Sequence, residues 1–390
     1  MTRHETSTNP KQKRGGPIQV FCSGDGHPLP EIDRAEGVYM WDTDRKRYLD
    51  GSSGPVICNP GHSNARVLKA MADQAAKVCF ASRAVFENAP NRRLAEKFVA
   101  LAGPGFDQAF IVSGGSEATE AAITLAHQYA VSKGEAGRWK VLARNPSYHG
   151  ATLGAVSITG DPQSEAVFEA VTRIMPKVPA PFGYRLPEGV NAETHAMACA
   201  NALEDIIRSE GPEIVLAFIM EPVGGLATNS IVAPVVAAGG FLHGHTYSAN
   251  PLSCAVAEAV PDEIIDRDLM LNATEISAYL RAQLGEVAAA SHIVGDIRGK
   301  GLLMAAEIVA DKTTKAILPA RHRAVYRLRD IGIEKGLLLY TGKTVGGAFG
   351  KWVMISPPLT LARAEADELV ALFSDTIAAF EAEIRAQGAI

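Results

Sequence analysis

The chain has 390 residues, 47% of them hydrophobic, with a net charge of −5 and a pI near 6.1. This length can bury a large core in about two domains, and the charge balance gives no general basic surface for nucleic acid. No apolar run is long enough to span a membrane. The five cysteines are scattered without a C-x-x-C pair, which is typical of buried thiols in a reducing compartment. We therefore expect a cytoplasmic protein that binds neither nucleic acid nor membrane.

The N-terminal part of the chain predicts a tail followed by extended structure. Residues 1–16 are polar and lack the apolar core of a secretory signal, so they predict a flexible tail. Residues 37–42 and 47–51 alternate in polarity around 43–46, which predicts a hairpin. His62 lies in a turn sequence after it, which predicts a turn residue. Helical spacing follows in 65–76 and 89–101.

The segment 109–118 predicts a buried strand, a glycine turn and the start of a helix. Ala109 to Val112 is apolar, Ser113-Gly114-Gly115 breaks the run, and a helical pattern continues from Ser116 through Tyr129. The first N–H groups of a helix have no partner inside it, so this arrangement can bind an anion. Ser116 can donate to that anion, or it can simply cap the helix.

Two further apolar strands are predicted to end in polar residues. Residues 139–143 precede Ser147-Tyr148-His149-Gly150, and residues 213–220 precede Glu221. Ligands bind at the carboxyl ends of the strands in open α/β sheets, and an aromatic residue there can stack on a flat ring. The alternatives are a surface tyrosine and a solvated carboxylate at a strand end.

The remainder predicts a loop at 243–251, a helix from Leu252 to Ala259 that Pro261 interrupts, and a C-terminal α+β region. In that region we expect a helix at 269–290, a strand pair in 293–309, a helix at 321–335 and strands at 337–340 and 352–356. A closing helix is expected at 361–387. The loop at 342–350, with Lys343 or Lys351, could lie near a substrate carboxylate or be merely solvated.

Four motifs occur together in one order: Ser-Gly-Gly-Ser at 113–116, Ser-Tyr-His-Gly at 147–150, Glu-Pro-Val at 221–223 and His-Gly-His-Thr at 243–246. In this combination the chain resembles the class III aminotransferases, pyridoxal-phosphate (PLP) enzymes of fold type I. The resemblance implies a large, mostly parallel-sheet α/β domain and a smaller α+β domain formed by the N- and C-terminal segments. The boundaries then fall at 17–64 for the N-terminal segment, 65–260 for the PLP-binding domain and 261–390 for the C-terminal domain.

The resemblance also assigns roles to particular residues. Gly115 and Ser116 would hold the cofactor phosphate, and Tyr148 would stack on its ring with His149 beside it. Glu221 would face the cofactor. The resemblance also places the stretch that carries His62 near the active-site entrance, so His62 is either a substrate contact or only a turn residue. Thr246 would reach the phosphate of a partner subunit, which implies a homodimer. The substrates implied are an amine or amino acid and a 2-oxo acid.

The family's two essential groups are missing from their expected place. Between the Glu-Pro-Val and His-Gly-His-Thr motifs, the family carries a Schiff-base lysine and an aspartate that pairs with the pyridine nitrogen. Here the 21 residues at 222–242 contain no Lys, Asp or Glu, and no Lys occurs between Lys177 and Lys300. The simplest interpretation is an internal block deletion joined near 228–231. We therefore assign no catalytic residue, expect no covalent aldimine and expect PLP binding to be weakened; Lys300, in a turn, is a poor replacement.

Two functional hypotheses follow from this. The chain is an aminotransferase whose sequence here lacks a block, and it is impaired as written, or it is a non-catalytic PLP-binding relative or partner subunit. Loss of interior strands would also leave backbone groups unpaired. We therefore expect reduced stability or a rearranged sheet in which the 213–221 strand gains an unusual edge.

Overall fold

A computed structural model describes residues 29–221, 226–227, 234–235, 237–238, 241–341 and 350–390. The chain divides into two compact units, which are described separately. The first contains the described residues of Met1–Ser63, Met270–Val345 and Gly350–Ile390, and the second those of Asn64–Leu269. The predicted tail at 1–16, the predicted join at 228–231 and nearly all of the 342–350 loop lie outside the described residues. Among those described, no helix combines the length and apolar character that crossing a membrane requires.

The first unit contains two mostly antiparallel sheets and three long helices. Its sheets have the strand orders β1-β2-β3-β11 and β12-β10-β9. The predicted hairpin is confirmed, because β2 and β3 pair antiparallel, and so are the strand pair β9–β10 and the long helices. The elements are β1 Ile32–Glu36, β2 Tyr39–Asp42, β3 Arg47–Asp50, α1 Ser53–Val56, α10 Leu269–Ala290, β9 Val294–Lys300, β10 Leu303–Ile308, η1 Ala320–His322, α11 Ala324–Lys335, β11 Leu337–Leu338, β12 Lys351–Ile355 and α12 Arg363–Ala386.

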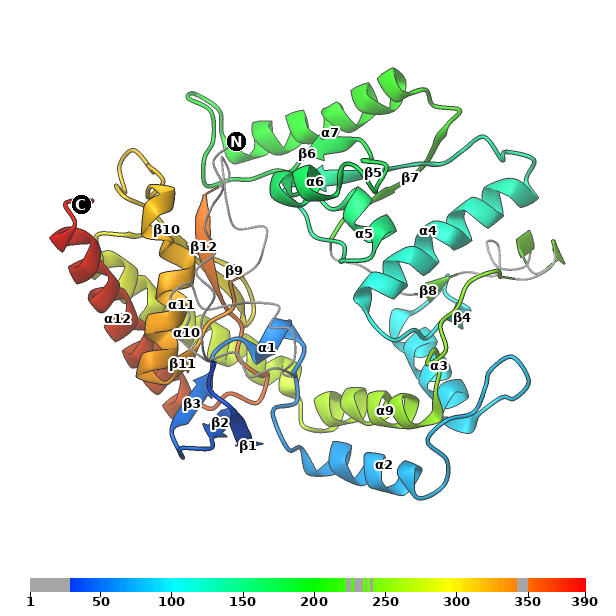
Figure 1. The fold of residues 1–390 in the computed structure, drawn as a ribbon, viewed down its shortest axis with the longest axis horizontal. Helices are drawn as coiled ribbons and strands as arrows, with labels where there is room; N and C mark the ends of the chain where they lie inside the picture. Colours follow the sequence, from blue (N-terminus) through cyan, green and yellow to red (C-terminus); the bar gives the residue numbers. More distant parts are fainter. Residues whose placement is uncertain (1–28, 222–225, 228–233, 236, 239–240, 342–349) are drawn as a thin grey trace, which may run out of the picture. The chain divides into compact units, whose positions relative to one another are not determined.

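The core of the first unit forms because α12 is amphipathic. Its Leu369, Phe373, Ile377 and Phe380 recur at helical spacing and are all buried. They pack in one cluster with buried residues of α10, α11 and the β9–β10–β12 sheet. Helices α11 and α12 contact each other along this face (Figure 1). The strand predicted at 337–340 is shorter than expected, since only Leu337 and Leu338 form a strand, in parallel with β3, and Tyr340 makes an isolated bridge with Met354.

A buried ion pair fixes the chain after β3. Nε2 of His62 lies 2.8 Å from Oδ2 of Asp50, and Asp50 is 1% exposed. The hydrogen bond to Asp50, with a further contact from Cys58, raises the pKa of His62 to about 10. Burial alone would raise the pKa of Asp50, but the bonds from His62 and Ser52 lower it overall. The structure therefore gives His62 a partner, and a role in contacting substrate stays a prediction.

The stability that this pair contributes is expected to depend on pH with a defined sign. Because the folded-state pKa of His62 is raised, its contribution is complete below pH 6.5 and is lost as the pH rises through about 10. The contribution of Asp50 is present above pH 3.8 and is lost as the pH falls through its lowered pKa. Urea unfolding of the native chain and His62→Gln should therefore differ by on the order of 2 kcal/mol at pH 6 and by clearly less at pH 9.5. A difference that grows with pH would contradict this.

The second unit contains a parallel sheet covered by helices. Strands β6, β5 and β7 pair in that order and in parallel, and α7 contacts β6, α5 contacts β5 and α4 contacts β7 (Figure 1). Val141, Ala143 and Ile158 form the buried cluster beneath them. The elements are α2 Ala65–Ala75, α3 Ala89–Ala102, β4 Gln108–Ala109, α4 Gly115–Ser132, β5 Lys140–Asn145, α5 Leu153–Ile158, α6 Pro162–Phe168, β6 Lys177–Pro179, α7 Ala192–Glu210, β7 Val215–Ile219, β8 Leu226–Ala227 and α9 Pro251–Asp266.

The strand predicted at 109–112 is wrong in length. Only Gln108 and Ala109 are in a strand, and they pair antiparallel with Leu226 and Ala227. Phe110, Ile111 and Val112 are only partly buried and lie outside any strand. An apolar run becomes a long central strand only when neighbouring strands pair with its backbone on both sides. Among the described strands, β7 likewise has one partner, β5, and lies at the edge of its sheet, as the sequence led us to expect.

The prediction that Pro261 interrupts a helix is also wrong. Helix α9 continues through Pro261 to Asp266. Proline removes one backbone hydrogen bond, but tertiary contacts hold the helix directly after it. Lys97 of α3 forms an ion pair of 2.6 Å with Asp262, and Asn64 donates to Glu263 at 2.8 Å. Packing against α2 and α3 therefore outweighs the local effect of the proline.

Candidate functional site

The N-terminus of α4 is open to a ligand. Its N-cap is Gly114, which is extended and gives no side-chain cap. The first helical bond runs from the N–H of Ala118 to the carbonyl of Gly114, so the amides before it have no helical acceptor. The carboxylate of Glu117 folds back over Gly114, 2.6 Å from where a Cβ would stand. An anion at this helix end would therefore share the space with that acidic group.

The turn after β5 docks directly on this helix end. The N–H of Ala151 donates to Oγ of Ser116 at 2.9 Å, and Oγ1 of Thr119 donates to the carbonyl of His149 at 2.8 Å. Gly150 has φ +134°, and a Cβ on it would lie 2.6 Å from Oγ of Ser116 and 2.9 Å from Cβ of Ala155. Only glycine allows this approach. The structure thus brings together two of the predicted motifs.

A third motif joins them at the end of β7. The N–H of Tyr148 donates to Oε1 of Glu221 at 3.3 Å, and Nη2 of Arg144 donates to the carbonyl of Glu221 at 2.8 Å. Glu221 as a whole residue is exposed, but its carboxyl group is partly desolvated, and this desolvation raises its pKa. The hydrogen bond from the Tyr148 amide and the charge of Arg144 oppose this shift without cancelling it. Tyr148 is 48% exposed. A flat ligand can therefore reach it.

His149 is buried in the middle of this cluster. It is 5% exposed, and its Nε2 has no hydrogen-bond partner among the described residues. Burial, followed by the positive charges of Arg144 and Lys177, lowers its pKa to about 4, so the imidazole is neutral near pH 7. Nε of Arg144 and Oδ1 of Asn145 are also buried without a described partner. Such groups are costly unless another molecule or another part of the chain satisfies them.

The loop that carries Thr246 is fixed at both of its ends. Nη2 of Arg83 donates to the carbonyl of His243 at 2.7 Å, and the side chain of Asn88 donates to the carbonyl of Ala249 at 2.9 Å. The N–H of Leu242 donates to Gln128 of α4 at 2.9 Å. Thr246 itself is exposed. The structure places the loop against α4 and α3, and the role of Thr246 toward a partner subunit stays a prediction.

The sequence reasoning missed Arg144 and the contact role of Gly150. Arg144 is a polar residue at the carboxyl end of a buried strand, and that position was a usable signal. The role of Gly150 depends on Ser116, which is 34 positions earlier in the chain, so no local pattern could reveal it. Lys177 of β6 was noted only as the last lysine before a long gap. Its charge acts on His149, while its Nζ donates to the carbonyls of Ser157 and Met175 at 3.0 and 2.8 Å.

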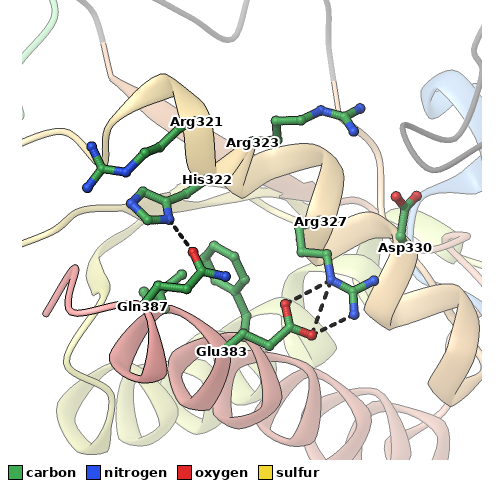
Figure 2. A pocket seen from close by; sticks show the side chains of 9 residues that line it. Arg321, His322, Arg323, Arg327, Asp330, Glu383 and Gln387 are labelled. Atoms are coloured by element: carbon green, nitrogen blue, oxygen red, sulfur yellow. Dashed lines mark hydrogen bonds and ion pairs between the residues drawn. The ribbon is translucent and has the colours of Figure 1, made fainter.

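Cavities lie beside the cluster and elsewhere. One of about 410 Å³ is lined by Asn145, Lys177 and Arg185 at the ends of β5 and β6, and one of about 370 Å³ by Arg83, Asn88 and Phe110. A smaller cavity of about 250 Å³ lies in the first unit (Figure 2). There Arg327 is paired with Glu383 and His322 with Gln387. It contains none of the predicted site residues, and of its three arginines Arg327 is already paired with a carboxylate.

The residues present fit the anchoring of a phosphate-bearing cofactor but not its covalent attachment. The open helix end, the hydroxyl of Ser116 and the accessible ring of Tyr148 suit a phosphate and a flat ring. The buried groups without partners suit additional polar atoms. The described lysine whose charge acts on the cluster, Lys177, is already bound to two carbonyls and lies 3.6 Å from Glu165.

Comparison with known proteins gives a consistent result. The family model described as aminotransferase class-III matches residues 21–234 and 224–377. An uncharacterised aminotransferase of Schizosaccharomyces pombe is 31% identical over 95% of this chain and 97% of its own length. One of Bacillus subtilis is 29% identical over 91% of this chain and 96% of its own. A mitochondrial gamma-aminobutyrate transaminase of Oryza sativa is 28% identical over 98% and 90%.

Solved structures agree on the fold. An amine transaminase from an uncultivated Pseudomonas species, in the PLP-bound form, has a TM-score of 0.84 at 26% identity and covers 95% of this chain and 99% of its own. An omega-transaminase from Thermomicrobium roseum has a TM-score of 0.82 at 26% identity, with 90% and 93% covered. The expected α/β architecture of PLP-dependent transferases of fold type I is thereby confirmed.

Proposed function

Because the chain belongs to the class-III aminotransferase family, we propose that it binds PLP at the N-terminus of α4 and that transamination by this chain is impaired for want of a suitable lysine. PLP is the cofactor of the family, and when bound it supplies a reactive carbonyl and an electron-accepting ring. The observation that carries the proposal is the convergence of Ser116, Tyr148 and Glu221. Three motifs far apart in the chain meet there.

We propose that each residue of this group helps to bind or position PLP. The amides of Gly115 and Ser116 and the Ser116 hydroxyl bind the phosphate, while Tyr148 covers one face of the ring. Glu221 holds the Tyr148 backbone in position through the bond at 3.3 Å. His149, neutral near pH 7, offers Nε2 to a polar atom of the ligand or of a neighbouring segment. The Gly150 contact keeps the turn on the helix end.

Two features of the comparisons support an internal deletion. The family model matches in two segments that overlap at 224–234, which includes the join expected near 228–231. The alignment to the Bacillus relative spans 429 positions, more than the 390 residues of this chain, although it covers only 91% of them. The relative therefore has residues opposite gaps. A form of the protein that kept such a block would move an amino group from an amine or amino acid to a 2-oxo acid.

The second candidate function is non-catalytic. The chain as written would bind PLP reversibly, or serve as a partner subunit to a complete copy. The absence of a Lys from 178–299 favours this hypothesis for the chemistry. In either case we propose a cytoplasmic homodimer in which Thr246, exposed on its loop, reaches toward the partner's phosphate.

Replacing the phosphate ligand tests the site. Ser116→Ala should weaken equilibrium binding of PLP roughly tenfold or more, because a hydrogen bond to a charged group contributes about 1.5–3 kcal/mol. Ser132→Ala is the matched control, since that hydroxyl at the other end of α4 bonds only to Tyr129 in its own helix. Binding is measured by equilibrium dialysis, with circular dichroism to check folding. If Ser116→Ala and the native chain bind PLP with equal affinity, the phosphate does not bind at this helix end.

A further inference from the structure

A cysteine, a histidine and an aspartate are aligned in the first unit, apart from the residues proposed to hold PLP. Sγ of Cys58 lies 3.4 Å from Nδ1 of His62, and Nε2 of the same ring lies 2.8 Å from Oδ2 of Asp50. Asp50 is buried, His62 is largely buried, and Cys58 is partly exposed. The order is that of a nucleophile, its imidazole partner and a carboxylate that orients the ring.

The carboxylate of Asp50 is held rigidly. Its Oδ1 accepts from the N–H and the hydroxyl of Ser52, both at 3.1 Å, while Oδ2 remains for His62. The loop between them takes an uncommon path. Ser53 and Val56 have positive φ values of 51° and 64°, which cost energy for residues with a side chain and most for a β-branched one. This path brings Cys58 back beside His62.

The charges in this row reinforce one another. The charged and titratable groups that act on His62 are Asp50 and Cys58, and they keep the ring protonated near pH 7. Both ring nitrogens then donate, Nε2–H to the carboxylate and Nδ1–H to the sulfur. The protonated ring thus places a positive charge and an N–H donor 3.4 Å from the sulfur of Cys58, an arrangement found beside reactive thiols.

The other described cysteines lack this combination. Cys254 is fully buried, and burial raises its pKa to about 11. Cys199 is 7% exposed, with its sulfur 3.8 Å from His195. Cys79 is exposed, but the contact of its sulfur is the carbonyl of Ala75 at 3.8 Å. If exposure alone determined reactivity, Cys79 would be the most reactive of the four. If activation by a neighbouring cation determines it, Cys58 is the most reactive.

We propose that Cys58 is a peroxide-reactive thiol, activated by His62 and Asp50, and that it is a redox modification site of this protein. The thiolate attacks one oxygen of hydrogen peroxide; an S–O bond forms and the O–O bond breaks. Sulfur is oxidised by two electrons to the sulfenic acid. The leaving hydroxide takes a proton from Nδ1 of His62 and departs as water, and solvent reprotonates the ring.

Peroxide fits the site better than an acyl substrate. Acyl transfer needs backbone N–H donors for the developing oxyanion, commonly that of the nucleophile itself. The N–H groups of Ile57 and Cys58 both already donate to the carbonyl of Ser53, at 3.0 and 3.1 Å. Attack on peroxide needs only a sulfur nucleophile and a nearby proton donor, and Cys58 and the protonated ring of His62 provide them.

The test is competition between cysteines of the same folded chain. The full-length protein is treated with limiting hydrogen peroxide at pH 6, trapped with dimedone and analysed by peptide mass spectrometry. A parallel series follows iodoacetamide alkylation from pH 5.5 to 9. With either reagent, Cys58 should react roughly tenfold faster than Cys79 at pH 6. In the alkylation series, the rate of Cys58 should change little up to pH 9. The rate of Cys79 should rise steeply towards pH 9.

His62→Gln should abolish the advantage of Cys58, whereas His195→Gln, which removes the imidazole beside Cys199, should leave it intact. Equal rates of Cys58 and Cys79 at pH 6, or an unchanged Cys58 rate in folded His62→Gln, would overturn the proposal. If His62→Gln does not fold, the pH series on the native chain decides the matter by itself. A Cys58 rate that rises with pH in parallel with Cys79 would then refute activation.

Discussion

Borohydride reduction of the purified chain with one equivalent of PLP is expected to leave its intact mass unchanged. A Schiff base requires an unprotonated lysine amine at the carbonyl of the cofactor. No lysine occurs in 178–299. Burial lowers the pKa of Lys177 and so favours its unprotonated form, but Ser157, Met175 and Glu165 occupy its amine. We therefore expect reversible binding only, and no transamination above background. Absorbance before and after reduction, with intact mass on the same sample, provides the measurement.

The matched control is the same chain with the lysine-bearing segment of a class-III relative inserted between residues 228 and 231. This variant should gain the mass of one cofactor per chain after reduction. A single cofactor fixed on the unaltered chain would contradict the argument from the missing lysine, and peptide mapping would then identify the amine, beginning with Lys177. A chain mass larger than that of the 390 residues would instead mean that the natural protein contains the block.

Gly150→Ala should destabilise the second unit and remove its affinity for PLP. The new Cβ would lie 2.6 Å from Oγ and 2.8 Å from Cα of Ser116, and the backbone φ of +134° is one that residues with a side chain rarely adopt. Strain and overpacking each cost about 1–3 kcal/mol, so we expect a loss on the order of 3 kcal/mol. The turn that carries Tyr148 would also leave the helix end, and PLP would lose both its ring contact and its phosphate contact.

Gly137→Ala controls for the loss of a glycine. Gly137 lies in the same unit, no atom is within 4 Å of its added Cβ, and its φ is not in the left-handed range. Urea unfolding should leave this variant within about 0.5 kcal/mol of the native chain, with unchanged PLP affinity. If Gly150→Ala were equally harmless, the turn would not be packed against Ser116 as described.

The success of the sequence-based predictions followed from how local each signal was. Helix α4 and the hairpin β2–β3 were predictable because side-chain periodicity and turn residues lie within one element. The long strand at 109–112 was not, because its existence depends on partner strands from elsewhere in the chain. Pro261 was misread for a related reason, since contacts from α3 to Asp262 keep α9 helical beyond it.

For the candidate site, the residue types were predictable and their contacts were not. Ser116, Tyr148 and Glu221 were chosen from motifs, and the structure adds that Gly150 and Arg144 hold them together. His62 was predicted as a turn residue or a substrate contact. Its bonds to Asp50 and Cys58 depend on a loop whose positive φ values no propensity would favour.

The sequence by itself determined which chemistry the chain can supply. A lysine absent from 178–299 is absent in every conformation, and the periodicity of each long helix follows from local spacing alone. Only the tertiary structure decided which groups meet: Gly150 with Ser116, and Cys58 with His62. The physical reason is that strand pairing, burial and ion pairing are properties of two partners. A sequence lists both partners, and the free energy of the whole packed chain determines whether they come into contact.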